Sequence, residues 1–229
     1  MSSAAEESDD LGAYISALVL NMGTPSQAQI DAFHAAGSAA NRRGKPIVFD
    51  PVGVGATPFR MRTASALLNA VHVSVVKGNA SEIGALSGLS EVQSRGVDSV
   101  GDGFKQPAEV VRSLARREKV TVAMSGVIDH VTDGQTVVRI HNGHPYQGTL
   151  TGSGCSASTA VACFAGVAGA AHSMLLPTVA AITTINVAAE LAAARIGSSG
   201  PGSFRAAFID ACATITPEDV TKHGKIDLM

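Results

Sequence analysis

The stretch IVFDPVGVGATP, residues 47–58, predicts a strand, a glycine-rich turn and the start of a helix. Residues 47–50 form a short apolar run that ends in Asp50, which is typical of a buried strand in a parallel sheet. Thr57 followed by Pro58 is typical of a helix N-cap with proline at the first helical position. We therefore expect one β–loop–α unit here, with a carboxylate at the end of its strand.

The same unit recurs on both sides of this stretch. Short apolar runs alternate with segments whose apolar residues recur every three to four positions. Strands that alternate with helices indicate βαβ units and a parallel sheet. Further strands are expected at 17–21, 73–77 and 120–124, and further helices after residues 24, 79 and 107.

The second half of the chain follows another pattern. Asp133 and Gly134 lie between apolar runs at 127–132 and 136–140, which is a strong hairpin signal. The predicted fold class is α/β, with a mostly parallel central sheet, helices on both faces and an antiparallel edge hairpin, in a single domain over residues 1–229. The last helices are expected at about 156–171, 175–196 and 204–213, with one helical turn from Thr216 and a frayed tail.

The composition excludes several classes of protein. Hydrophobic residues make up 45% of the 229 residues, which is enough for a sizeable core. A net charge of −2 provides no basic surface for nucleic acid or for a membrane. No charged residue lies between Arg139 and Glu190, but polar residues interrupt that region, and its unbroken apolar stretches are shorter than the ~18 residues of a membrane span. We expect no nucleic-acid partner and no membrane segment.

The three cysteines are Cys155, Cys163 and Cys212. An odd count without a CxxC pair argues against a disulfide framework or a zinc site. Cys163 and Cys212 lie within apolar helical patterns and are expected in the core. A reduced, cytoplasmic protein is the expected class.

The loop TGSGC, residues 151–155, is the first indication of function. It lies before a run of small residues that predicts a helix from Ser156, and free N–H groups at a helix N-terminus bind phosphate. A thiol at such a place favours the thiolate form, so Cys155 is a candidate nucleophile or base. The alternative is a tight turn with a buried small residue at position 155.

Polar side chains also follow the predicted strands. In open α/β sheets, ligands bind beyond the carboxyl ends of the strands, so these groups are expected on one rim. Asp50 could bind Mg²⁺ or its waters, since Mg²⁺ prefers oxygen ligands; an Asp-Pro turn is the alternative. The other candidates are Asn21, Lys77, Asn79, Glu82 and Ser125.

Two of these segments have structural alternatives. Lys77 could neutralise nucleotide phosphate and Glu82 could help to hold Mg²⁺, but Asn79 and Glu82 also have capping-box spacing. His141 and His144 resemble half a metal site, but no other cluster completes it, and a turn is favoured.

Taken together, the segments closely resemble the hydroxyethylthiazole kinase family of the ribokinase-like superfamily. The resemblance covers nearly the whole chain. Its segments are ALVLNMG (17–23), DPVGVGATPFR (50–60), GNASEI (78–83), VTDG (131–134), HNGHP (141–145), TGSGC (151–155) and GPGSF (200–204).

The resemblance implies phosphorylation of the alcohol of 4-methyl-5-(2-hydroxyethyl)thiazole, with ATP as co-substrate and Mg²⁺ as cofactor. It implies that the N–H groups of Gly152, Ser153, Gly154 and Cys155 hold the transferred phosphoryl group, with Cys155 orienting the hydroxyl or acting as a weak base. The remaining implied roles are nucleotide contacts by Lys77, Ser125 and Asn79, substrate contacts by Gly152, Met1 and Asn21, and acidic groups for Mg²⁺ at Asp50 and Glu82.

The resemblance also implies a homotrimer with active sites between subunits, and a fused or neighbouring thiamine-phosphate synthase. Met1 matches a methionine that lies well inside other members, so the chain is expected to be N-terminally shortened. Two alternatives stay open: a related phosphotransferase such as a hydroxymethylpyrimidine kinase, and a non-catalytic kinase-like subunit.

Overall fold

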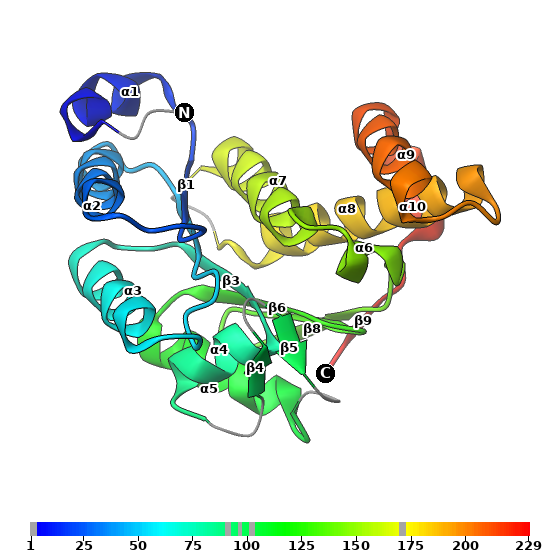
Figure 1. Cartoon of the computed structure of the whole chain (residues 1–229), viewed down its shortest axis with the longest axis horizontal. Coiled ribbons are helices and arrows are strands. Elements are labelled where there is room, and N and C mark those ends of the chain that lie inside the picture. Colours follow the sequence, from blue (N-terminus) through cyan, green and yellow to red (C-terminus); the bar gives the residue numbers. More distant parts are fainter. Residues whose placement is uncertain (1–3, 90–92, 96–97, 101–103, 170–172) are drawn as a thin grey trace.

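The computed structural model describes residues 4–89, 93–95, 98–100, 104–169 and 173–229. Its centre is a seven-stranded sheet in the order β1-β2-β3-β6-β7-β8-β9, in which β1, β2, β3 and β6 are parallel and β7, β8 and β9 are antiparallel (Figure 1). The strands are β1 (Leu18–Asn21), β2 (Ile47–Asp50), β3 (Val75–Asn79), β6 (Thr121–Ser125), β7 (Asp129–Thr132), β8 (Val137–Ile140) and β9 (Ile226–Leu228), and a separate hairpin comprises β4 (Gln93–Arg95) and β5 (Asp98–Val100).

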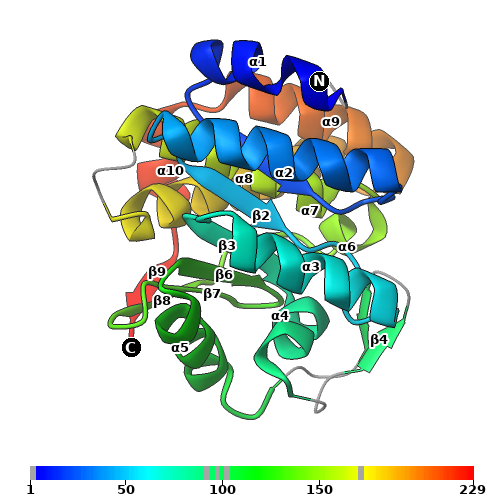
Figure 2. The same ribbon diagram turned by 90° about the vertical axis from the view of Figure 1, so that its left-hand side faces the viewer.

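Helices cover both faces of the sheet, as expected for a parallel sheet with βαβ connections. One face packs against α2 (Gln27–Arg42), α3 (Pro58–Ala70), α4 (Ala80–Ser87) and α5 (Pro107–Glu118), and the other against α7 (Ser153–Ala168) and α8 (Leu175–Ile196) (Figure 2). The remaining helices are a 3₁₀ turn (Ala5–Glu7), α1 (Ser8–Tyr14), α6 (Tyr146–Thr149), α9 (Pro201–Thr214) and α10 (Pro217–His223).

The short apolar strands form two cores at once. Along β2, Ile47 and Phe49 enter the core with α2 to α5, whereas Val48 between them enters the core with α7 and α8. Successive side chains of a strand point to opposite faces, so an unbroken apolar run fits a strand that is buried on both sides. The predicted α/β class, the parallel strands and the antiparallel edge are confirmed.

Three local predictions are wrong. The tail is not frayed: β9 pairs with β8, and Arg139 forms an ion pair with Asp227 across them at 2.6 Å. Helix α7 begins at Ser153, three residues before the predicted start, so the glycine loop is part of its first turn. Cys163 is exposed on α7 and is not a core residue, whereas Cys212 is half-buried against the core between α8 and α9.

Polar residues such as Thr183 and Asn186 keep the unbroken apolar runs of the long helix α8 short, as predicted. Helix α8 has 22 residues and, by length and composition alone, is long and apolar enough to cross a membrane. However, 67% of that stretch is buried inside the protein, against α7 and α9. The helix is apolar because it lies between other elements, a place that hydropathy cannot distinguish from a bilayer.

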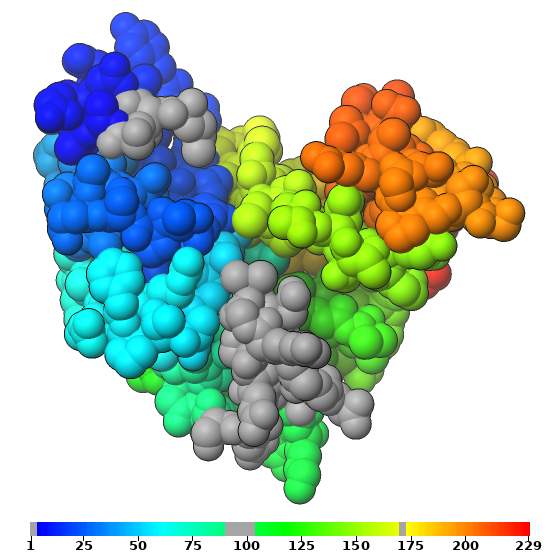
Figure 3. Space-filling model, in the orientation of Figure 1, coloured from blue at the N-terminus to red at the C-terminus, as the bar shows by residue number. Residues whose placement is uncertain are grey.

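The surface has a notch between the N-terminal helices α1 and α2 and the C-terminal helix α9. Helix α7 lies at the floor of this notch (Figure 3). The first turn of α7 is therefore at the surface, beside the carboxyl ends of β1 and β2.

Candidate active site

The polar groups predicted at the strand ends are brought to one rim. Asn21 is the direct neighbour of Asp50 in the register of β1 and β2, and Asn79 is the neighbour of Ser125 in that of β3 and β6. Parallel strands end at the same edge of a sheet, so the rim follows from the topology. The expected convergence is confirmed for these strand-end residues.

Asn21 joins two candidate groups of the site. Its Nδ2 donates to Oδ2 of Asp50 at 2.9 Å and lies 3.2 Å from Sγ of Cys155. Its Oδ1 accepts the N–H of Gly23 at 2.9 Å, which fixes the orientation of the amide. One side chain thus aligns the carboxylate at the end of β2 with the thiol at the start of α7.

Asp50 is 3% exposed and lies at the centre of this cluster. Its Oδ2 also accepts the hydroxyl of Ser158, one helical turn beyond Gly154, at 2.7 Å. Burial raises the pKa of Asp50, while Lys77, Ser158 and Asn21 oppose that rise. Within the described residues its Oδ1 has no hydrogen-bond partner, so one carboxylate oxygen is left for a ligand.

Glu82 has both carboxylate oxygens engaged by backbone groups. Oε1 accepts the N–H of Gly53 and Oε2 the N–H of Asn79, each at 2.8 Å. The capping box predicted from the spacing is present, since the Asn79 side chain accepts the N–H of Glu82 in return. Burial raises the pKa of Glu82, and the nearby charge of Asp50 raises it further. Glu82 therefore fixes the turn after β2 whether or not it contacts a metal.

Lys77 is the one buried lysine or arginine in the described part of the chain. Its Nζ donates to the backbone oxygen of Gly154 at 3.1 Å. Its charge also acts on the carboxylates of Asp50, Glu82 and Asp129. Three carboxylates face one buried cation, which leaves net negative charge for a ligand cation to offset.

The first turn of α7 has the geometry of an anion site. Gly152 is the N-cap with φ +94°, a conformation that favours glycine. Across the described residues, the N–H groups of Gly154 and Cys155 have no acceptor, whereas that of Ser153 bonds to Leu150. Two free N–H groups and the helix dipole thus face the rim.

The other predicted residues have local roles in the structure. The hydroxyl of Ser125 donates to the backbone oxygen of Gly78, and that of Ser153 to the backbone oxygen of Gln147. Met1 lies outside the described residues, so the structure does not describe its expected substrate contact.

Sequence reasoning missed two residues of the rim. Arg60 donates to the backbone oxygens of Met22, Val52 and Gly23 at 2.6 to 2.8 Å, which joins the loops after β1 and β2. Ser158 holds Asp50 from α7. Arg60 ends the DPVGVGATPFR segment, and Ser158 lies one helical turn after Gly154, so the sequence gives some indication of both. Neither pattern, however, identifies the distant group that the residue contacts.

The residues present fit Mg²⁺ as a weakly held ion. Mg²⁺ keeps several waters and uses one or two carboxylates together with substrate phosphates. Within the described residues, no group of three or more His, Cys, Asp or Glu could hold a metal on its own. Asp50 and Glu82 therefore match a site that is completed by water and nucleotide.

The HNGHP segment is a structural turn in this fold. Nδ2 of Asn142 donates to the backbone oxygen of His223 at 2.8 Å and contacts Glu190, and its Oδ1 accepts the N–H of Lys225 at 2.6 Å. The segment thus anchors α10 and β9 to α8, which agrees with the predicted turn.

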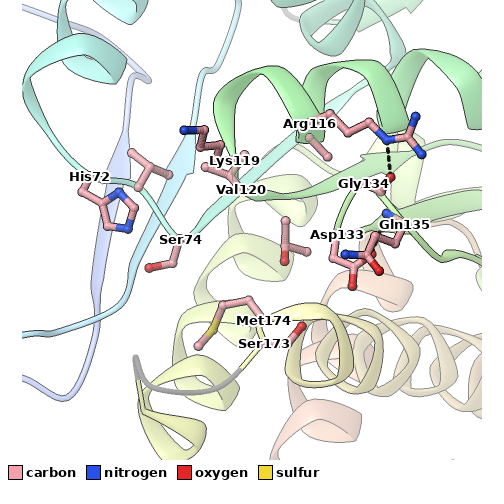
Figure 4. A pocket seen from close by; sticks show the side chains of 13 residues that line it. His72, Ser74, Arg116, Lys119, Val120, Asp133, Gly134, Gln135, Ser173 and Met174 are labelled. Carbon is pink, nitrogen blue, oxygen red and sulfur yellow. Dashed lines mark hydrogen bonds between the residues drawn. The ribbon is translucent and has the colours of Figure 1, made fainter.

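A cavity in the described part of the chain lies elsewhere. It has a volume of about 570 Å³ and lies at the amino ends of β3 and β6, opposite the rim. Figure 4 shows Lys119, Arg116 and His72 around it. The rim is the better candidate because the buried acids, the buried cation and the free N–H groups meet there.

Comparisons with known proteins first identify the fold. The structure of a pyridoxal kinase from Staphylococcus aureus in complex with ADP matches with a TM-score of 0.60 at 19% identity, over 80% of this chain and 65% of that chain. The likeness is one of fold: both chains share this class of α/β architecture, with a mostly parallel sheet covered by helices on both faces.

A finer assignment follows from closer relatives. The sequence model described as the Hydroxyethylthiazole kinase family matches residues 1–218. A hydroxyethylthiazole kinase from Thermoanaerobacter sp. (strain X514) is 40% identical over 228 residues, 100% of this chain and 85% of the relative. The structure of a hydroxyethylthiazole kinase from Pyrococcus horikoshii OT3 matches with a TM-score of 0.87 at 33% identity, over 100% of this chain and 83% of that chain. The chain belongs to the hydroxyethylthiazole kinase family.

Proposed function

We propose that the chain transfers the γ-phosphoryl group of ATP to the primary hydroxyl of 4-methyl-5-(2-hydroxyethyl)thiazole, in thiamine salvage. The observation that carries the proposal is the position of Asn21, Asp50 and Cys155 beside the free N–H groups of α7, in a chain of this family. The alcohol oxygen bonds to the γ-phosphorus, the bond from that phosphorus to the bridging oxygen of ADP breaks with its electron pair staying on ADP, and the hydroxyl proton passes to water.

Phosphoryl transfer depends mainly on positioning and charge neutralisation. The N–H groups of Gly154 and Cys155 hold the transferred group and the charge that develops on it. Cys155 orients the substrate hydroxyl, because the hydrogen bond from Asn21 holds its Sγ beside these N–H groups. The backbone N–H and the hydroxyl of Ser153 stabilise this turn by donating to the backbone oxygens of Leu150 and Gln147.

The remaining rim residues bind the two substrates. Lys77, Asn79 and Ser125 form the nucleotide side, with Lys77 opposing phosphate charge. Asn21 and Gly152 form the thiazole side. Asp50 and Glu82 would hold Mg²⁺ through its waters, and the ion would offset the charge of the triphosphate.

The proposed setting is a single kinase domain in the cytoplasm, assembled as a homotrimer, with a fused or neighbouring thiamine-phosphate synthase using the product. What supports an assembly is exposed apolar surface where α7 ends and α8 begins, at the opposite end of α7 from the rim: Val167 on α7 is 91% exposed and Leu176 at the start of α8 is 75% exposed. Such side chains are usual at contacts between subunits.

The test is ADP release from Mg-ATP by the purified chain, with the thiazole alcohol, with a hydroxymethylpyrimidine, and with neither. Turnover that depends on the thiazole alcohol, with phosphate on its oxygen by ³¹P NMR, is the expected result. Turnover with the pyrimidine alone would identify a related kinase. ATP binding without turnover would identify a non-catalytic subunit. Asp50→Asn is the matched control and should abolish turnover.

A further inference from the structure

Asp129 and Asn186 form a buried polar pair next to the rim. Nδ2 of Asn186, on α8, donates to Oδ2 of Asp129, at the start of β7, at 2.7 Å. Asp129 is 5% and Asn186 7% exposed. The proposed chemistry uses neither side chain, and a buried carboxylate persists only where its hydrogen bonds are satisfied.

The pair joins two parts of the site. On one side, Oδ1 of Asp129 accepts the N–H of Gly126 at 2.8 Å, which closes the turn after Ser125. On the other side, Oδ1 of Asn186 accepts Nε2 of Gln147, on α6, at 3.2 Å. The backbone oxygen of Gln147 accepts the hydroxyl of Ser153 at 2.7 Å, in the first turn of α7. A continuous set of hydrogen bonds thus joins the nucleotide side of the rim to the phosphoryl side.

The direction of each hydrogen bond is fixed by the two ends of this set. The carboxylate of Asp129 only accepts, so Asn186 must present its amino group there and its oxygen to Gln147. Gln147 then presents its own oxygen to the N–H of His144, which it accepts at 2.9 Å. No amide can turn over without leaving one donor facing another donor.

The HNGHP segment makes room for this arrangement. Gly143 has φ +135°, and a Cβ there would lie 3.1 Å from Oε1 of Gln147 and 3.8 Å from Cγ of Asn186. A side chain at this position would displace Gln147. The segment thereby shapes the place at which α6 meets α8.

We propose that Asn186 is a positioning residue that couples the nucleotide turn (residues 125–129) to the first turn of α7, through Asp129 and Gln147. This inference rests on the proposed function, because it concerns the alignment of ATP with the N–H groups of α7. In this proposal, Asn186 on the mostly apolar helix α8 affects catalysis without contacting either substrate.

A reciprocal exchange tests the coupling. Asn186→Asp places two carboxylates together, and Asp129→Asn leaves one amide pair mismatched. The double variant Asp129→Asn with Asn186→Asp restores every hydrogen bond, and the negative charge then lies on residue 186 instead of residue 129. Each single variant should lose about tenfold in kcat/KM for ATP, with KM raised, and the double variant should return to within about threefold of the wild type.

The matched control is Thr183→Ala, on the same helix. The hydroxyl of Thr183 is buried and donates only to Val179 of α8, at 2.8 Å. This variant should lower Tm and leave kcat/KM for ATP unchanged. If Asn186→Asp behaved like Thr183→Ala, or if the double variant were no better than the worse single variant, the proposal would be overturned.

Hydrogen exchange separates the proposal from the proposed function. Asn186→Asp should speed amide exchange both in residues 125–130 and in residues 146–155. If the wild type showed no thiazole-dependent turnover, the proposed function would fail, and faster exchange in both segments would still support the coupling. Faster exchange in one segment alone would overturn it.

Discussion

The amide nitrogen of Asn21 lies 3.2 Å from the sulfur of Cys155, although the two residues are 134 positions apart in the chain. The same nitrogen donates to Asp50, so the thiol and the carboxylate share one donor. In the proposed function, Cys155 therefore orients the substrate hydroxyl beside a fixed electrostatic site, which leads to a first prediction.

Cys155→Ala should retain measurable turnover, because the N–H groups of Gly154 and of residue 155 itself remain in place. We expect a fall in kcat with KM for ATP nearly unchanged. The measurement is steady-state ADP release, with binding of both substrates by calorimetry. A variant that bound both substrates and had no turnover would make Cys155 the essential base and contradict the electrostatic account.

Glycine replacements should differ by position. A Cβ at Gly154 would lie 3.3 Å from Nζ of Lys77, so Gly154→Val should displace the lysine and abolish turnover. Gly152→Ala has open space around it but must adopt φ +94°, at a cost of about 1–2 kcal/mol, so it should lower stability and activity together. Gly148→Ala is the matched control, since nothing lies within 4 Å and its φ is not positive. Activity and Tm of the three variants check the order.

Arg60→Met should lower kcat/KM by about tenfold or more, because it leaves the backbone oxygens of Met22, Gly23 and Val52 without their donor. Without these hydrogen bonds, nothing from Arg60 joins the loop after β1 to the loop after β2. Asn21 lies at the start of the loop after β1, so its position should become less fixed. Arg62→Met removes the same charge from an exposed position on the same helix and should be neutral. Equal effects in the two variants would reduce the role of Arg60 to its charge.

Asp129 should make stability depend on pH. Burial raises the pKa of Asp129 from 3.8 to about 6, against the opposing effects of Gly126, Asn186 and Lys77. Between these values the folded state binds more protons than the unfolded state, so the free energy of unfolding falls as pH rises from about 4 to about 6. At about 1.4 kcal/mol per unit, the loss is on the order of 3 kcal/mol. Asp129→Asn should lack this part of the slope.

Urea denaturation of both proteins from pH 4 to pH 8 checks this prediction. Asp50 and Glu82 also have raised pKa values, and they contribute to the slope in the same direction in both proteins. The difference between the two curves therefore isolates Asp129. If the free energy of unfolding changed with pH equally in the wild type and the variant, the prediction for Asp129 would be contradicted.

Much of the site could be predicted from local sequence patterns. Apolar runs of four to five residues define the strands, and the residue that ends each run must reach the carboxyl edge of a parallel sheet. For this reason the sequence alone predicts Asn21, Asp50 and Ser125 on one rim. The capping box of Asn79 and Glu82 is equally local, because both partners lie within one helical turn.

The sequence by itself determined the order of strands and helices and the polar residues at the strand ends, since periodicity and caps act over a few residues. Only the tertiary structure decided that Ser158 and Asn21 hold Asp50, that Asn186 reaches Asp129, that β9 completes the sheet and that Cys163 faces outward. Each of these depends on which distant segments meet, and the free energy of such contacts comes from packing and burial that no local pattern encodes.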